Sequence, residues 1–317
     1  MAIALTFPGQ GSQVPGMGKT LADNFAVARV VFEEVDDALG QHLSQLMWQG
    51  AAEELSLTVN TQPALMAVSF AVVRVLESET GLDIAADVDF VAGHSLGEYS
   101  ALAAAGALSL ADTARLLRIR GEAMQQAVPV GEGAMAALLG LDFAEVVSIV
   151  EEAAQHDVCA AANDNGPGQV VVSGHVAAVE RAIAIAQSRG AKRAILLPVS
   201  APFHCALMEP AAERMHEALA SVEVRAPLVP VFANVHAAPI SGPADIREAL
   251  VAQVTGTVRW RESVAAMAAA GVDVFFELGA GKVLTGLAKR IAPTARGLSV
   301  GGPDDIAGFQ TVLATVR

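Results

Sequence analysis

Residues 89–104 read Asp89-Phe90-Val91-Ala92-Gly93-His94-Ser95-Leu96-Gly97-Glu98-Tyr99-Ser100-Ala101-Leu102-Ala103-Ala104. The first five residues are apolar enough for a short buried strand, and the residues after Ser95 are helix formers until Gly106. Gly93-x-Ser95-x-Gly97 matches the nucleophile-elbow pattern, in which glycines permit a sharp strand-to-helix turn that exposes a serine. The pattern alone is common, but its position between a strand and a helix is what the elbow requires. This stretch therefore predicts an α/β fold with Ser95 as a nucleophile.

On both sides of this stretch, strands alternate with helices. That alternation predicts a mostly parallel sheet, and we expect an α/β-hydrolase-like large domain formed by residues 1–127 and 200–317. The expected strands are 3–7, 89–93, 229–234 and 274–278, and the expected helices are 25–39, 63–77, 95–104, 110–126, 203–219, 245–253, 260–270 and 284–290.

The pattern changes between residues 128 and 199. Strands are expected at 134–139, 158–162, 169–173 and 194–199, and helices at 143–154 and 176–189. Residues 163–168, Asn-Asp-Asn-Gly-Pro-Gly, give a strong turn signal between two of these strands. The order β-α-β-β-α-β is that of a ferredoxin-like unit, so we expect residues 128–199 to form a small inserted domain.

Composition excludes several classes of function. Hydrophobic residues make up 53% of the 317 residues, so a sizeable core is expected. The formal charge of −14 argues against nucleic-acid binding, which requires an excess of Lys and Arg. The sequence shows neither a signal peptide nor an apolar run of about 20 residues, so no membrane association and a cytoplasmic location are expected. Cys159 and Cys205 lack the spacing of a zinc site, and no metal is expected.

A serine nucleophile needs a general base, and the sequence contains seven histidines. His204 lies in the loop Pro202-Phe203-His204, where the chain returns from the predicted insert. A single histidine in a loop is more often structural than catalytic. In an ordinary α/β hydrolase the order is Ser, Asp, His, with the histidine near the C-terminus. Here no aspartate is obviously placed to orient His204, so a neutral amide or carbonyl is the expected partner, which weakens the esterase interpretation.

Motifs along the whole chain carry a family resemblance. They are Phe7-Pro8-Gly9-Gln10-Gly11-Ser12-Gln13, Gly93-His94-Ser95-Leu96-Gly97-Glu98-Tyr99, Asn163, Gly166-Pro167-Gly168-Gln169, Arg120-Gly121, Pro202-Phe203-His204 and Gly279-x-Gly281-Lys282-Val283-Leu284. With these motifs the chain closely resembles the bacterial malonyl-CoA:acyl carrier protein transacylases of type II fatty-acid synthesis, essentially end to end.

The resemblance implies a role for each matching residue. Ser95 would be the nucleophile and His204 the base, with the backbone carbonyl of Gln253 orienting the histidine. Gln10 and Leu96 would supply oxyanion-hole N–H groups. The residues implied to contact the acyl group are Arg120, Met124 and Phe203, where Phe203 favours malonyl over methylmalonyl.

Arg120 also makes chemical sense by itself. A guanidinium holds a carboxylate with two parallel hydrogen bonds, and a malonyl thioester has a carboxylate that an acetyl thioester lacks. The alternative is a solvated basic face shared with Arg115 and Arg118.

The resemblance implies ping-pong transfer of malonyl from malonyl-CoA to the phosphopantetheine thiol of an acyl carrier protein, with no resident cofactor and a monomeric enzyme. The alternatives are a serine thioesterase, which would use water as acceptor, and an acyltransferase component of a polyketide or malonate-processing system.

Overall fold

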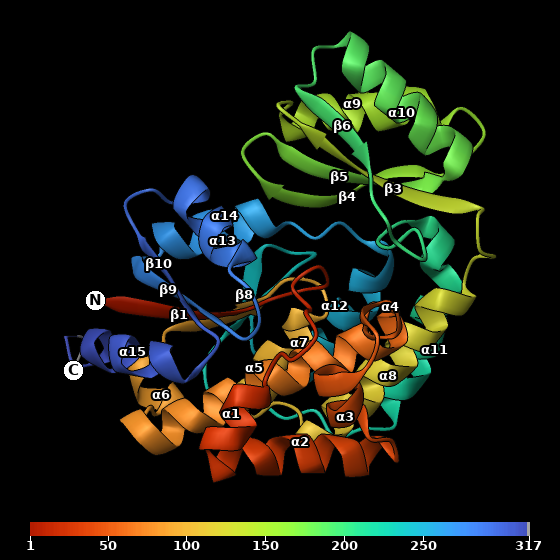
Figure 1. Cartoon of the computed structure of the whole chain (residues 1–317). Helices are drawn as coiled ribbons and strands as arrows, with labels where there is room; N and C mark the ends of the chain where they lie inside the picture. The colour runs from red at the N-terminus through yellow and green to blue at the C-terminus, as the bar shows by residue number, and fades with distance from the viewer. Residues whose placement is uncertain (316–317) are drawn as a thin grey trace.

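The computed structural model describes residues 1–315, which form two sheets and their covering helices (Figure 1). The larger sheet has six strands in the order β10-β9-β1-β2-β7-β8, and every pairing is parallel except β7 with β8. Its strands are β1 (Ala2–Phe7), β2 (Phe90–Gly93), β7 (Val231–Ala233), β8 (Ala238–Ile240), β9 (Val272–Leu278) and β10 (Arg296–Val300). The four strands expected here are present, whereas β8 and β10 were not predicted from the sequence.

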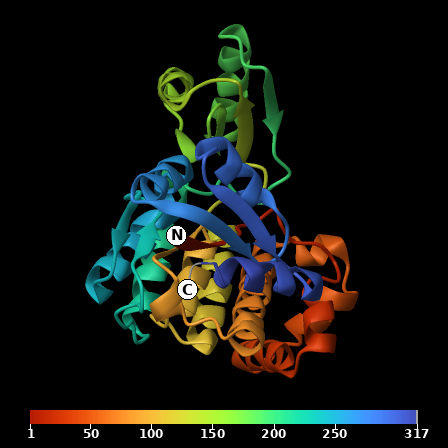
Figure 2. The ribbon, with the colours of Figure 1, turned by 90° about the vertical axis from the view of Figure 1, so that its left-hand side faces the viewer.

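Helices cover both faces of this sheet (Figures 1 and 2). Side chains of β1 alternate between the faces, so Ile3, Leu5 and Phe7 pack into one core while Ala4 packs into the other. The helices of this part are α1 (Lys19–Asn24), α2 (Ala26–Leu39), α3 (Leu43–Gln49), α4 (Ala52–Leu55), α5 (Thr58–Thr80), α6 (Ile84–Asp87), α7 (Gly97–Ala104), α8 (Leu110–Gln126), α11 (Glu209–Ala220), α12 (Pro243–Thr255), α13 (Trp260–Ala269), α14 (Val283–Ile291) and α15 (Ile306–Leu313).

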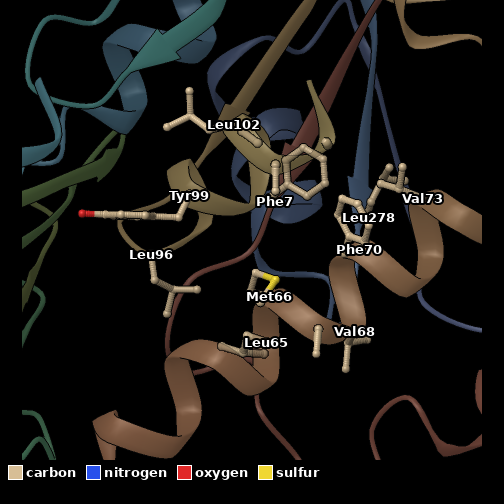
Figure 3. Packing of buried hydrophobic residues seen from close by; sticks show 14 of the residues in the cluster. Phe7, Leu65, Met66, Val68, Phe70, Val73, Leu96, Tyr99, Leu102 and Leu278 are labelled. Carbon is tan, nitrogen blue, oxygen red and sulfur yellow. The ribbon is translucent and has the colours of Figure 1, made fainter. Parts of the chain in front are cut away.

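Helix α5 is the central helix of the larger core. Figure 3 shows Met66 and Phe70 of α5 on one side of Phe7 of β1, with Leu102 of α7 on the other. By length and composition α5 could cross a membrane, but 89% of its apolar window is buried inside the structure. That burial is typical of a core helix, since a helix that is apolar all round is stable in water only when it is covered.

The smaller sheet contains four antiparallel strands in the order β4-β5-β3-β6. It is formed by β3 (Gly133–Leu139), β4 (Cys159–Gly166), β5 (Gln169–His175) and β6 (Arg193–Leu196), with α9 (Phe143–Ala154) and α10 (Val176–Ser188). One hydrophobic cluster joins its strands to these two helices. The order β-α-β-β-α-β along the chain is the one expected from the sequence.

Two local predictions are wrong. The turn expected over residues 163–168 is shorter, because β4 continues through Asn163 to Gly166. The helix expected over 203–219 begins at Glu209, after a 3-10 turn at Ala206–Met208. His204 has φ of 60°, which a continuous right-handed helix does not allow.

The smaller sheet is attached to the larger part along β4. The backbone N–H of Val258 donates to Ala162 O at 2.9 Å, and the N–H of Asp164 donates to Val258 O at 2.9 Å. Arg261 of α13 also pairs with the buried carboxylate of Asp164 at 2.8 Å. Near the end of β4, Asn165 Oδ1 lies 2.7 Å from His94 Nε2, so this part of the strand lies beside the elbow.

Candidate active site

The turn between β2 and α7 holds Ser95 at the carboxyl edge of the larger sheet. Ser95 has φ of 54°, a left-handed conformation that is rare for a residue with a side chain. A Cβ on Gly93 would lie 1.8 Å from the carbonyl carbon of Gly97, so only glycine permits the tight turn. The strained serine and its glycine neighbour form the elbow expected from the sequence pattern.

His204 lies against Ser95. The Ser95 Oγ to His204 Nε2 distance is 2.8 Å, and His204 Nδ1 is 2.8 Å from the backbone oxygen of Gln253. A carbonyl oxygen can only accept, so Nδ1 carries the proton and Nε2 is free to accept from the serine hydroxyl. The oxygen of Gln253 is available because it lies in the last turn of α12, where carbonyls lack helical partners.

Burial keeps the imidazole of His204 neutral. Its pKa is lowered to about 3, first by desolvation and then by the charge of Arg120. A neutral imidazole is the form that can accept a proton from Ser95.

Arg120 is 2% exposed and points into the same site from α8. It donates to Gln62 Oε1 at 2.7 Å, to Gln253 Oε1 at 2.9 Å and to Ser95 Oγ at 3.1 Å. Helices α5 and α8 approach closely at Gly121, where a Cβ would lie 2.7 Å from Val59 Cα. The close approach places Gln62 of α5 next to the guanidinium. Arg120 is therefore a buried cation that faces the nucleophile, unlike Arg115, which pairs with Asp112 on the surface.

The loops after β1 and β2 lie side by side. A Cβ on Gly9 would be 2.7 Å from the backbone oxygen of His94, so glycine allows this approach. Gln10 and Leu96 therefore line one cavity. Within residues 1–315 neither of their backbone N–H groups donates a hydrogen bond, and that of Leu96 precedes the first turn of α7. Such N–H groups can stabilise an oxyanion.

The cavity has a volume of about 370 Å³ and lies between the two sheets. Seven of the eight predicted site residues line it: Gln10, Ser95, Leu96, Arg120, Met124, Phe203 and His204. Gln253, whose backbone oxygen contacts His204, is the eighth and lies behind the cavity. Met135, Val171 and Leu197, from the smaller sheet and its connection, complete the lining on the other side. Within the described part of the chain, no group of three or more His, Cys, Asp or Glu side chains could hold a metal ion.

Sequence reasoning missed three residues of the site. Asn234 accepts from the backbone N–H of Ser95 at 2.7 Å and donates to Gly93 O at 2.7 Å, which fixes the turn on both sides. Gln62 contacts Arg120, and Glu98 lies behind the elbow with an exposure of 1%. The available signal was a polar side chain next to apolar residues, as at Gln62 before Pro63-Ala64-Leu65-Met66 and at Glu98 after Leu96-Gly97.

A strained serine, a neutral histidine and unpaired backbone N–H groups in one cavity define a serine-dependent acyl-transfer site. Residues 5–296 match the family model of the acyl transferase domain, and the chain belongs to this family.

Relatives of the chain are named for one activity within this family. The chain is 48% identical to the Malonyl CoA-acyl carrier protein transacylase of Escherichia coli (strain K12), over 96% of this chain and 97% of that protein. It is similar to the crystal structure of acyl-carrier-protein-S-malonyltransferase from Bartonella henselae, with 58% identity, a TM-score of 0.97 and coverage of 99% and 100%. A malonyl-transacylase solved in complex with its type II PKS acyl-carrier protein is 43% identical, with a TM-score of 0.95 and coverage of 98% and 100%. These matches confirm the resemblance found in the motifs, and with it the expectation of an acyltransferase.

Proposed function

We propose that this chain transfers the malonyl group of malonyl-CoA to the phosphopantetheine thiol of an acyl carrier protein, through a malonyl ester on Ser95. The observation that supports this most directly is the contact of Ser95 Oγ with both His204 Nε2 and the buried Arg120. One contact activates the serine, and the other offers a cation to an acyl group that carries its own carboxylate. The names of the relatives agree with this activity.

The first half-reaction acylates the enzyme. His204 Nε2 takes the Ser95 proton as Oγ attacks the thioester carbon, and the developing oxyanion is held by the N–H groups of Gln10 and Leu96. The carbon–sulfur bond then breaks, and the proton on His204 goes to the CoA thiolate. Arg120 binds the malonyl carboxylate throughout, while Met124 and Phe203 line the cavity around the acyl group.

The second half-reaction is the reverse, with a new thiol. The carrier's phosphopantetheine thiol gives its proton to His204 and attacks the ester, and Ser95 Oγ leaves and recovers the proton. The mechanism requires no resident cofactor or metal. We propose that the enzyme acts as a cytoplasmic monomer, without membrane or nucleic acid.

We also propose the domain division expected from the sequence: residues 1–127 and 200–317 as an α/β-hydrolase-like catalytic domain and 128–199 as a ferredoxin-like insert. The sheet order β4-β5-β3-β6 and the separate hydrophobic cluster of the insert support this division. The active site then lies between two domains, where ligand sites often occur.

Intact-mass analysis tests the proposal. Malonyl-CoA should add one malonyl mass, mapped to the peptide that contains Ser95, and addition of a carrier protein in its phosphopantetheine form should move that mass to the carrier. Acetyl-CoA should give little adduct. Steady release of malonate without a thiol acceptor would instead indicate a thioesterase.

A carrier of polyketide assembly is a second candidate acceptor, because one similar structure is a complex with such a carrier. Comparing the rates at which fatty-acid and polyketide carriers remove the malonyl group from Ser95 distinguishes the two.

A further inference from the structure

Glu98 lies one helical turn after Ser95, on the side of the elbow away from solvent, with an exposure of 1%. Its Oε2 accepts from the backbone N–H of Asn234 at 3.0 Å and from Gln253 Nε2 at 2.7 Å. Its Oε1 is buried and has no hydrogen-bond partner within residues 1–315. A buried carboxyl oxygen without a partner is costly, so a role for this group is expected.

The side chain of Gln253 connects Glu98 to the reacting groups. Its Nε2 also donates to Ser95 O at 3.0 Å, and its Oε1 accepts from Arg120 at 2.9 Å. An ionised carboxylate can only accept, so Glu98 requires the NH₂ end of the amide on its own side. The oxygen end is thereby directed at Arg120. Glu98, together with the backbone oxygen of Ser95, thus fixes which end of the Gln253 amide the guanidinium meets.

Glu98 and Arg120 also interact through their charges. In the part of the chain that the structure describes, the side chains that accept hydrogen bonds from Arg120 are neutral: Gln62, Gln253 and Ser95. Glu98 is the anion that this network reaches, one amide away from the guanidinium. Burial raises the pKa of Glu98 to about 7, against the opposing effects of its hydrogen bonds and of the charge of Arg120.

The other titratable groups around the network hold no charge near pH 7. Burial raises the pKa of Tyr99, the neighbour of Glu98 on α7, and lowers the pKa of His204 and of His94. A carboxylate bound to Arg120 would offset the positive field that favours ionised Glu98. The protonated fraction of Glu98 would then rise.

We propose that Glu98 is a positioning residue that fixes the Gln253 amide, and through it Arg120, and that it binds a proton from solvent when a carboxylated acyl group occupies Arg120. No bond of the substrate changes in this step, and the proton returns to solvent when the acyl group leaves. The inference rests on the proposed function, because it requires Arg120 to bind the acyl carboxylate.

Calorimetry measures the proton directly. In the Ser95→Ala background, which cannot be acylated, malonyl-CoA binding is measured at pH 7 in buffers of different ionisation enthalpy. We expect an uptake of up to roughly half a proton, the fraction that a group with a pKa of about 7 can still bind. Acetyl-CoA and the double variant Ser95→Ala/Glu98→Gln should show none. Ser95→Ala/Glu277→Gln is the matched control and should keep the uptake, since Glu277 of β9 is equally buried but binds the N–H groups at the start of α14.

Acylation rates test the positioning role. Glu98→Gln keeps an oxygen that can accept from Asn234 and Gln253, so it should retain malonylation of Ser95 within about tenfold of the wild type. Glu98→Leu removes that acceptor and should lose about 10²-fold.

Each outcome decides between hypotheses. Proton uptake that persists without Glu98, or its absence from an enzyme that does form malonyl-Ser95, would overturn the inference alone. Failure of the wild type to form malonyl-Ser95 would overturn the proposed function. If Glu98→Leu does not fold, the calorimetric comparison with Glu98→Gln still decides.

Discussion

Two strand-to-helix turns of the larger sheet both depend on glycine but serve different purposes. They follow β2 and β9, the two strands that pair with β1. Between β2 and α7 the chain reads Gly93-His94-Ser95-Leu96-Gly97, and between β9 and α14 it reads Gly279-Ala280-Gly281-Lys282-Val283. Left-handed residues occur in both: Ser95 with φ of 54° in the first, and Gly279 and Gly281 with φ of 131° and 84° in the second. The elbow thus places a side chain where the other turn has glycine.

The two turns also differ in what their helix ends bind. At α14 the buried Glu277 accepts from the N–H groups of Leu284 and Thr285 at 3.1 and 2.7 Å, and from the Thr285 hydroxyl at 2.7 Å. At α7, Leu96 lines the cavity, and within residues 1–315 its backbone N–H donates no hydrogen bond. A helix start whose donors are taken by a buried carboxylate serves stability, whereas one that keeps a donor free can serve chemistry. A free donor at the helix start thus distinguishes the functional turn from the structural one.

The largest effect should come from the elbow side chain. Ser95→Ala removes the attacking oxygen, so malonyl transfer should fall by at least ~10⁴-fold, measured by transfer of labelled malonyl to the carrier. The free energy of unfolding should stay close to that of the wild type. A malonyl adduct that persists on this variant would mean that another residue is the nucleophile.

The next effect concerns Arg120, the buried cation that contacts Ser95 of the elbow. Arg120→Ala removes a charge-assisted contact to the acyl carboxylate, so malonyl transfer should fall by about 10²-fold or more, while acetyl transfer should fall far less. Rates with the two CoA esters provide the measurement. Equal losses for both esters would show that Arg120 has a structural role. The elbow would then not be distinguished from the other turn by a cation that binds the acyl group.

The matching experiment at the other turn should change stability and leave catalysis intact. Glu277→Ala leaves buried donors of Leu284 and Thr285 without an acceptor, which should cost about 2–3 kcal/mol in urea denaturation. Malonyl transfer per folded molecule should match that of the wild type. A loss of transfer in excess of the loss of folded protein would mean that the two turns are coupled.

Local patterns predicted the elbow and the alternation of strands and helices, because glycine spacing and hydrophobic periodicity depend only on residues that are close together in the sequence. They did not predict the short edge strands β8 and β10, since edge pairing depends on tertiary context. The helix expected over 203–219 failed for a related reason. The left-handed His204 is held by Ser95 and Gln253, residues that are 109 and 49 positions away along the chain.

Matching motifs pointed to seven of the residues that line the cavity, and the structure brings them together around Ser95. Gln62 also lines the cavity, and the motifs missed it. Asn234 and Glu98, which lie behind these residues, were missed because the sequence shows a polar side chain near apolar residues but not the partner that the fold gives it. Asn234 ends a short apolar strand, and only the fold shows that its amide contacts both Gly93 and Ser95.

The smallest expected effect isolates backbone strain from chemistry. At a left-handed position a side chain costs about 1–2 kcal/mol relative to glycine. Ser95→Gly should therefore be more stable than Ser95→Ala by about 1 kcal/mol, with neither variant active. Gly281→Ala should lose a similar amount of stability, because φ is 84° there and the new Cβ would lie 3.2 Å from Ser12 Cβ. Thermal and urea unfolding of the three variants give the two differences. If Ser95→Gly and Ser95→Ala are equally stable, the backbone of the elbow is not strained, and its left-handed serine is no indication of function. A loss of stability in Gly281→Ala alone would then reflect crowding by Ser12.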